Sequence, residues 1–210
     1  MIIPLTPSYL RSVSEANVVL DPTSFLADQG ATGIEFRQKF YYPALMEDPD
    51  CFVWLYLFEG AVAGYIAGTK DCGAFLKRLK RFNPLGLGGL VMKALLKRPG
   101  LSVKYAQMLA FKDRDSASEP HPAEILSFGV YPQFRGRDFK TSTGISVAQA
   151  LFNKAMESFR LKNVRKFQVL TLQENIAGNR FYEKQGCRKA GVASPFGSPC
   201  NVYVGEVVTR

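Results

Sequence analysis

The segment SFGVYPQFRGRDFKTSTGIS contains glycines and arginines in an order that could bind phosphate. A strand-like run ends at Val130, Arg135-Gly136-Arg137 follows, and a helix begins after Gly144. A glycine-containing loop that opens a helix exposes backbone N–H groups and the positive end of the helix dipole, and both attract phosphate. The two arginines would add positive charge. An ordinary solvated turn would have the same composition, so both interpretations stay open.

The loop differs from two familiar nucleotide-binding patterns. It is not a P-loop, because Phe139 precedes Lys140 where that motif needs glycine, and it contains no G-x-G-x-x-G. A dinucleotide-binding fold is therefore disfavoured. We expect Ser142 or Thr143 to cap the helix that follows, since both residue types favour that position.

Composition places the chain among ordinary globular proteins with a bias toward anionic partners. Its 210 residues are 47% apolar and carry a formal net charge of +9. That charge favours the phosphates of a cofactor, nucleic acid or an acidic membrane face, without choosing among them. The four cysteines have no close paired spacing and only one histidine accompanies them, so we expect free thiols and no bound metal.

The sequence shows neither a signal peptide nor a candidate membrane span. The first residues, MIIPLTPSYL, lack a basic region followed by an apolar one. The longest apolar run, PLGLGGLVMKALL, contains Lys93 and is shorter than the roughly 20 residues that cross a bilayer. We therefore expect a cytoplasmic protein with no transmembrane segment, and peripheral membrane contact is an open alternative.

The order of predicted elements indicates an α/β fold with a mixed sheet. Two β-rich runs joined at Glu59-Gly60 form a predicted hairpin. Later the chain alternates strand, helix, strand, helix and strand, which is typical of α/β folds. A glycine within the predicted strand AEILSFGVYP often marks a bulge. The other predicted segments are the strands MIIPL, KFQVLTL and NVYVGEVV and the helices GIEFRQKFYYPAL, GISVAQALFNKAMESFRL and NIAGNRFYEKQG.

Residues 71–120 differ in character, and we interpret them as a helical insertion in a single domain that spans residues 1–210. Between Gly73 and Phe111 there are eight Lys or Arg and no acidic residue. Three interpretations are open: a lid whose cations meet an anionic acceptor, a helical hairpin packed on the sheet, or an amphipathic surface on an anionic membrane. The apolar residues of the membrane interpretation are Phe75, Leu76, Leu79 and Phe82.

The segment from residue 124 to residue 191 resembles the GNAT superfamily of N-acetyltransferases. Strand, V-x-P-x-x-R-G, helix and strand are followed by Asn175, by Tyr182 seven residues later and by Gly186 eleven residues later. The resemblance implies a GNAT-like acyl-CoA N-acyltransferase fold with the helical insertion between its third and fourth strands. It also implies acetyl-CoA as the acyl donor, with its pyrophosphate at the loop QFRGR. The cofactor-binding residues that it implies are Phe128, Val130, Gln133, Arg135, Gly136, Arg137, Gly144 and Asn175.

The resemblance implies catalytic roles for two side chains. Tyr182 corresponds to the tyrosine that protonates the departing thiolate, and a phenol with an ordinary pKa of about 10 is protonated at neutral pH. Glu124 corresponds to the glutamate that serves as general base in histone-type members, although an exposed carboxylate at a strand start would look the same. His121 is a second candidate base. Backbone N–H groups near Gly129 and Val130 are the expected donors to the thioester oxygen.

The loop departs from the family pattern at two positions. Asp138 and Lys140 stand where the family has small residues. Either those residues have been replaced, or the loop is longer and resumes at GIS. We favour the longer loop, because it restores the usual distance to the next strand.

We therefore predict an enzyme that transfers an acetyl group from acetyl-CoA to a primary amine of a small molecule in a ternary complex. No cysteine falls at a motif position for a covalent intermediate. The expected acceptors are an amino sugar, for instance a nucleotide-linked one, then a polyamine or amino acid, then a protein lysine. A homodimer is also considered. The competing predictions are an inactive coenzyme A-binding relative and a basic module for membranes or nucleic acid, of which nucleic acid is disfavoured because the basic residues cluster on a leucine-rich segment.

Overall fold

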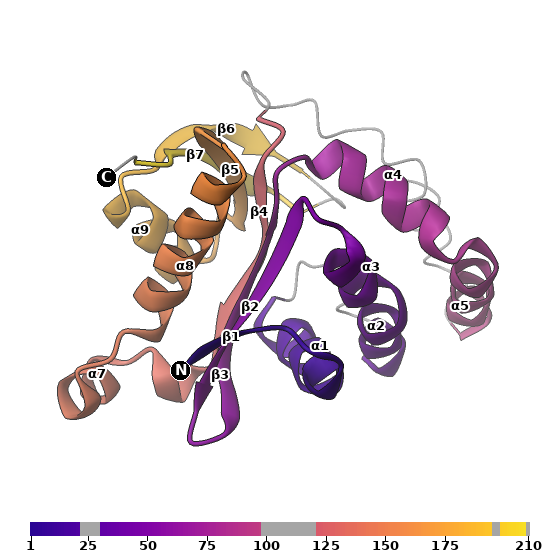
Figure 1. Cartoon of the computed structure of the whole chain (residues 1–210), viewed down its shortest axis with the longest axis horizontal. Helices are drawn as coiled ribbons and strands as arrows, with labels where there is room; N and C mark the ends of the chain where they lie inside the picture. The colour runs from indigo at the N-terminus through magenta and orange to yellow at the C-terminus, as the bar shows by residue number, and fades with distance from the viewer. Residues whose placement is uncertain (22–29, 98–120, 195–197, 209–210) are drawn as a thin grey trace.

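The computed structural model describes residues 1–21, 30–97, 121–194 and 198–208, which form a mixed sheet with helices on both faces (Figure 1). The order of the seven strands is β1-β2-β3-β4-β5-β7-β6. Neighbouring strands are antiparallel except β4 and β5, which are parallel. The strands are β1 (Ile2–Pro4), β2 (Cys51–Phe58), β3 (Ala61–Thr69), β4 (Glu124–Val130), β5 (Lys166–Leu172), β6 (Arg188–Ala193) and β7 (Cys200–Glu206).

Helices from the first half of the chain lie on one side of the sheet, and two helices from the second half cover the other (Figure 1). The first group is α1 (Leu10–Leu20), α2 (Ala31–Phe36), α3 (Tyr42–Glu47), α4 (Cys72–Phe82) and α5 (Pro84–Lys97). The second group is α8 (Val147–Leu161) and α9 (Ile176–Lys184). The remaining helical segments are η1 (Pro7–Tyr9), η3 (Arg37–Tyr41), η5 (Pro132–Phe134) and α7 (Arg137–Thr143).

Strand β2 is an almost continuous apolar run because helices cover both of its faces. Phe52 and Tyr56 belong to the buried cluster on the α8 side, and Val53 and Leu55 belong to the cluster on the α1 to α5 side. The ring of Phe52 meets that of Phe159 in α8 edge-on, with 5.1 Å between centroids. Because successive side chains of a strand point to opposite faces of the sheet, β2 contributes to the hydrophobic clusters on both faces.

Helices α2 and α3 form one helical segment with a wider turn, η3, between them, where the helix GIEFRQKFYYPAL is predicted. Pro43 has no N–H for the carbonyl one turn earlier, and its ring would crowd that carbonyl in a regular helix. The π-turn relieves this, since the Tyr42 N–H bonds to the Arg37 oxygen five residues back. Arg37, the first residue of this turn, is buried, with 2% of its surface exposed.

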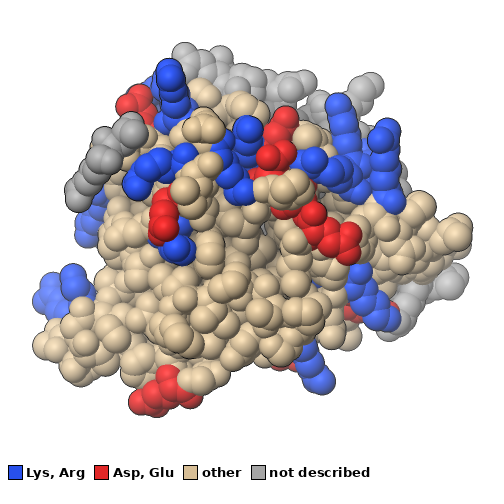
Figure 2. Space-filling model, in the orientation of Figure 1, with Lys and Arg blue, Asp and Glu red and all other residues tan. Residues whose placement is uncertain are grey.

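Helix α4 packs its apolar side against the protein. Phe75 and Leu79 are buried, and Leu76 and Phe82 pack against the same cluster. The basic side chains of α4 face outward and gather at the upper right of Figure 2. Two of the four apolar residues of the membrane interpretation, Phe75 and Leu79, are therefore covered by the protein itself. Residues 98–120 of the predicted insertion lie outside the described residues.

The polar stretch after Gly136 forms the short helix α7 where a longer loop is predicted. Asp138 lies in its first turn and Lys140 in its last, as the helix dipole favours, and Gly144 ends it with a φ of 71°. The next helix, α8, begins later, so its N-cap is Ser146 and the predicted caps, Ser142 and Thr143, are wrong. Strand β6 is also missing from the predicted elements, because the mixture of charged and small residues in RKAGVA hides its alternation.

Replacing Gly64 by alanine should destabilise the sheet where β3, β4 and α8 meet. A Cβ at this position would lie 2.8 Å from the Gly129 carbonyl oxygen and 3.2 Å from Leu151 Cδ1. Overpacking of this kind costs about 1 to 3 kcal/mol. Thermal unfolding measures the loss, at roughly 2 to 4 °C per kcal/mol for a chain of this size.

The matched control is Gly73→Ala in α4, where a Cβ would meet nothing closer than 3.4 Å. Alanine is the better helix former, so this control should be neutral or slightly stabilising. Equal melting temperatures for the Gly64→Ala variant and the wild type would contradict the close approach of α8 to β3.

Candidate active site

The parallel strands β4 and β5 separate almost as soon as they pair. Two residue pairs are in register, Glu124 with Gln168 and Ile125 with Val169. Beyond them β4 continues beside β3, and β5 continues beside β7. The backbone groups on the facing edges of the two strands therefore lack a strand partner along most of β4.

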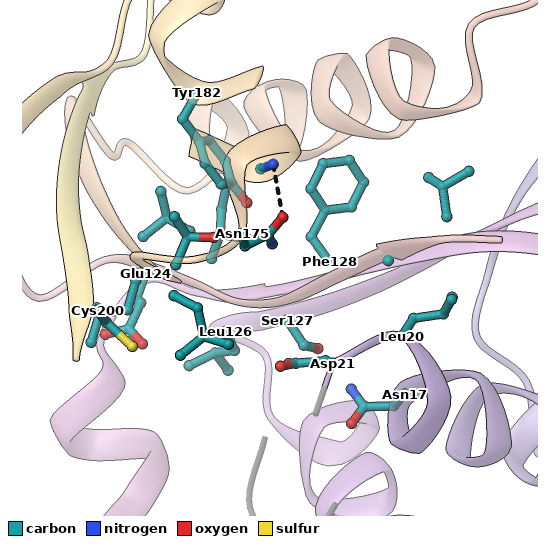
Figure 3. A pocket seen from close by; sticks show the side chains of 18 of the residues that line it. Asn17, Leu20, Asp21, Glu124, Leu126, Ser127, Phe128, Asn175, Tyr182 and Cys200 are labelled. Atoms are coloured by element: carbon teal, nitrogen blue, oxygen red, sulfur yellow. Dashed lines mark hydrogen bonds between the residues drawn. The ribbon is translucent and has the colours of Figure 1, made fainter. Parts of the chain in front are cut away.

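The gap between the two strands holds a cavity of about 770 Å³. Residues 126–130 of β4 and residues 169–172 of β5 line it. Its walls come from both sides of the sheet, because α8 and α9 contribute Ala148, Phe181 and Tyr182 while α1, η3 and α4 form the opposite wall (Figure 3). A cavity that passes through a sheet can hold two molecules that approach from opposite faces.

A bulge in β4 decides which of its side chains face which part of the cavity. Ser127 pairs with Ala67 and Ile125 pairs with the next residue of β3, so Leu126 has no opposite residue. Leu126 and Ser127 consequently both face the α1 side, as residues at a bulge can. The predicted bulge thus exists, but at Leu126 and not at Gly129, which is regularly paired.

Backbone N–H groups of β4 point into the gap. The Tyr131 N–H bonds to the Ala63 oxygen on β3, and alternate residues of a strand direct their N–H groups the same way. The Gly129 N–H therefore also points toward β3, while those of Phe128 and Val130 point toward the gap. Of the two predicted donors to a thioester oxygen, Val130 has the required direction and Gly129 does not.

Asn175 caps helix α9 at the edge of the cavity. Its Oδ1 accepts a hydrogen bond from the Gly178 N–H at 3.0 Å (Figure 3), which leaves Nδ2 as the donor end of the side chain. Asn179 holds the turn before the helix, since its Nδ2 donates to the carbonyl oxygens of Leu172, Gln173 and Asn175. The end of β5 and the start of α9 are thereby tied together.

Tyr182 is held at the other end of α9. Gly186 follows the helix with a φ of 78°, in the left-handed conformation that glycine adopts easily. This turn lets the backbone N–H of Cys187 donate to the backbone carbonyl oxygen of Tyr182 at 3.0 Å. The side chain is buried and lines the cavity, with its hydroxyl directed from α9 toward β4 (Figure 3). Burial raises the pKa of Tyr182 well above its ordinary value.

Glu124 is a buried carboxylate at the start of β4 and lines the cavity, so the alternative of an exposed strand-start residue is wrong. Gln168 Nε2 donates to Glu124 Oε2 at 2.9 Å. Gln168 Oε1 in turn accepts from the His121 backbone N–H at 3.3 Å. His121 thus lies beside the candidate base through its backbone, while it is not among the residues that line the cavity.

The predicted phosphate loop is only partly at the cavity. Arg135 lines it, whereas Gln133, Gly136, Arg137 and Gly144 do not. The predicted site residues that the cavity brings together are Glu124, Phe128, Val130, Arg135, Asn175 and Tyr182.

The N-terminus of α8 opens onto the same end of the cavity. Ala148, in its first turn, is a lining residue, and the hydroxyl of Ser146 makes no capping hydrogen bond. The first N–H groups of a helix have no partner within the helix. This end of α8 therefore has the properties of an anion site.

Four polar residues that no sequence motif reveals line the wall on the α1 side. They are Asn17, Asp21, Arg37 and Ser127, three of which are labelled in Figure 3. Arg37 Nη1 donates to the Gly33 oxygen at 2.9 Å, and Nε donates to Asn17 Oδ1. Burial lowers the pKa of Arg37, yet a guanidinium stays charged at neutral pH. Asn17 and Asp21 come from α1 and its C-cap, Arg37 from η3 and Ser127 from β4, so only the tertiary structure unites them.

Cys200, at the start of β7, also lines the cavity (Figure 3). All four cysteines are free and buried. Burial raises the pKa of Cys200 to about 11, so its thiol is protonated at neutral pH. Among the described residues, no three metal-ligating side chains come together. Within the same part of the chain, no helix has both the length and the apolar character to cross a membrane.

Solved structures with the same arrangement are acetyltransferases. An N-acetyltransferase from Staphylococcus aureus is 16% identical, with a TM-score of 0.65 over 98% of this chain and 100% of that one. A protein from Desulfovibrio desulfuricans assigned to the GNAT family of acetyltransferases is 14% identical, with a TM-score of 0.55 over 99% of each chain. Arabidopsis thaliana NAA60, solved in complex with acetyl-CoA, is 14% identical, with a TM-score of 0.54 over 98% and 97%.

The chain therefore has the fold of GNAT acetyltransferases, and the predicted α/β fold with a mixed sheet is confirmed. That the segment between β3 and β4 is an insertion stays a prediction. No model of a known protein family matches the sequence, and a search among curated proteins finds no significant match. At these levels of identity the likeness concerns the fold, so the reaction has to be argued from the residues of the cavity.

Replacing Asn175 by alanine should destabilise the protein by about 1 kcal/mol, because α9 loses its capping acceptor. Asn175→Asp keeps an acceptor at the cap and removes only the Nδ2 donor, so its stability should match the wild type. Urea unfolding of the two variants measures the difference. If both variants are equally stable, the cap at Gly178 does not hold α9 in place.

Proposed function

We propose that the protein transfers an acetyl group from acetyl-CoA to a primary amine of a small molecule. One observation carries the proposal: the cavity between β4 and β5 unites a buried tyrosine, a buried carboxylate and free strand N–H groups. Tyr182 and Glu124, both buried there, are the proposed acid and base. A fold shared with known acetyltransferases supports it.

The donor would enter the gap from the α8 side. The first turn of α8 and the guanidinium of Arg135 offer positive charge for the pyrophosphate. The Nδ2 group of Asn175 would donate to the pantetheine arm, and Phe128 and Val130 would line its path. The acetyl-CoA complex of NAA60, which has the same fold, supports the choice of donor.

The amine would reach the thioester from the α1 side as an ammonium and first give a proton to Glu124. Its nitrogen then attacks the carbonyl carbon, while the N–H group of Phe128, which also points into the gap, donates to the carbonyl oxygen as negative charge develops there. The C–S bond breaks, the electron pair leaves on sulfur, and Tyr182 supplies the proton that sulfur takes up. The new amide nitrogen loses its extra proton to the Tyr182 phenolate, and Glu124 releases its proton to water.

The raised pKa of Tyr182 has two consequences for this step. It keeps the phenol protonated and ready to donate. It also makes complete transfer to a solvated thiolate unfavourable, because a thiol has an ordinary pKa of about 8.5. A thiolate in the same dry cavity is destabilised as well. We therefore expect the proton to move while the C–S bond breaks.

Direct transfer in a ternary complex is supported by the state of Cys200. A covalent route would need a thiolate at the cavity, and the raised pKa of Cys200 keeps its thiol protonated at neutral pH. Four free thiols also fit a reducing compartment, so we keep the cytoplasm as the proposed location. The amino sugar stays a prediction for the acceptor.

Replacing Arg135 by alanine should weaken acetyl-CoA binding about tenfold, the loss of one charge-assisted contact to a phosphate. Arg137→Ala is the matched control, because Arg137 is exposed and does not line the cavity. Calorimetric titration with acetyl-CoA measures both affinities. Equal losses in the two variants would contradict the placement of the pyrophosphate, and tight binding without turnover on any amine would favour an inactive coenzyme A-binding relative.

Replacing Tyr182 by phenylalanine should lower kcat about 100-fold, the usual contribution of a general acid. Because the pKa of Tyr182 is raised, the wild-type phenol stays protonated as the pH rises, and its contribution is not lost through its ordinary pKa of about 10. The ratio of wild-type to variant kcat should therefore stay constant between about pH 6 and about pH 10. A ratio that collapses toward one over this range would refute Tyr182 as the acid.

A further inference from the structure

The wall of the cavity on the α1 side is mainly apolar and aromatic. We call this half of the cavity, on the sheet face covered by α1, η3 and α4, the acceptor chamber. Its apolar residues belong to the buried cluster on that face and are Leu20, Phe36, Tyr41, Phe75, Leu76 and Leu79. Apart from the Tyr41 phenol, these six side chains offer sugar hydroxyls and phosphates no hydrogen-bond partner, and buried polar groups need hydrogen bonds.

The charged groups of the acceptor chamber are more negative than positive. Asp21 and Glu124 line it with a single cation, Arg37, among the described residues. This contrasts with the chain as a whole, which has a formal net charge of +9. Two nitrogens of Arg37 are already engaged by Asn17 and Gly33, which tie its guanidinium to α1 and α2. The net negative charge of the acceptor chamber therefore favours a ligand with one positive charge.

Ser127 provides an independent sign of a polar ligand. Its hydroxyl is buried, lines the cavity and meets no hydrogen-bond partner of proper geometry among the described residues, although the phenols of Tyr41 and Tyr42 lie nearby. A hydroxyl oxygen can accept from an ammonium. The bulge turns Ser127 toward the α1 side of the sheet, where Asp21 also lines the cavity (Figure 3).

We propose that the acceptor is a hydrophobic primary amine with a single positive charge, such as an arylalkylamine or a branched alkylamine, without a carboxylate or phosphate. Its ammonium would lie between Asp21, Ser127 and Glu124, at the start of the gap where β4 leaves β5. Its apolar body would rest against α4 and η3. This rests on the proposed function and narrows the acceptor class.

The test compares three acceptors with acetyl-CoA as donor: 2-phenylethylamine, phenylalanine and glucosamine. The first two differ by one carboxylate, and burying an unpaired carboxylate is costly. We expect kcat/KM for 2-phenylethylamine to exceed those for the other two by about tenfold or more. An equal or higher value for phenylalanine or glucosamine would overturn the proposal.

If none of the three amines is turned over, calorimetry measures whether 2-phenylethylamine binds to the protein with coenzyme A bound. Failure of 2-phenylethylamine to bind while the protein binds acetyl-CoA overturns the acceptor class alone. Failure to bind acetyl-CoA overturns the proposed function itself. The two failures are therefore distinguishable.

A variant tests the role of the acceptor-chamber carboxylate. Asp21→Asn should raise KM for 2-phenylethylamine about tenfold, with a smaller change in kcat and an unchanged acetyl-CoA affinity. Asp138→Asn is the matched control, since Asp138 is exposed in α7 and does not line the cavity. An unchanged KM in a folded Asp21→Asn variant would contradict recognition of the ammonium at this position.

Discussion

The early separation of β4 from β5 is the constraint on which the rest of the site depends. After two residue pairs the strands diverge, and each keeps its other neighbour, so the sheet stays intact while a gap opens within it. Strand N–H groups that would pair in a continuous sheet then face a cavity. Glu124 stands where the strands still pair, and Val130 stands at the open end. The same divergence thus creates space, hydrogen-bond donors and a path between the two faces.

The two faces of the sheet supply different chemistry to that gap. On one face, α8 presents its N-terminus, and α9 is capped at both ends, by Asn175 and by the turn at Gly186, which places Tyr182 on the cavity wall. On the other face, the bulge at Leu126 turns Ser127 toward α1. A donor bound from one side and an amine bound from the other would meet only in the gap, which explains how the fold can join two substrates without a covalent intermediate.

The sequence was informative wherever structure and chemistry follow from neighbouring residues. The hairpin, the later strands and the helix from Asn175 to Gly186 depend on local periodicity and capping, and the spacing of Asn175 and Tyr182 identified the fold. The acceptor chamber could not be found this way, because Arg37 and Ser127 meet only after distant elements pack. Whether Glu124 is exposed also depends on its neighbours across the sheet. The prediction of a longer loop before α8 was wrong, since a polar stretch can form a short helix as readily as a turn.

A crystal structure of the protein with acetyl-CoA would test the central claim most directly. We predict that the thioester lies in the gap between β4 and β5, with its sulfur beside the Tyr182 hydroxyl and its carbonyl oxygen facing the Phe128 N–H. The pyrophosphate should lie at the first turn of α8. Acetyl-CoA bound outside the gap, or a thioester that lies away from Tyr182 with β4 and β5 closed upon each other, would contradict it.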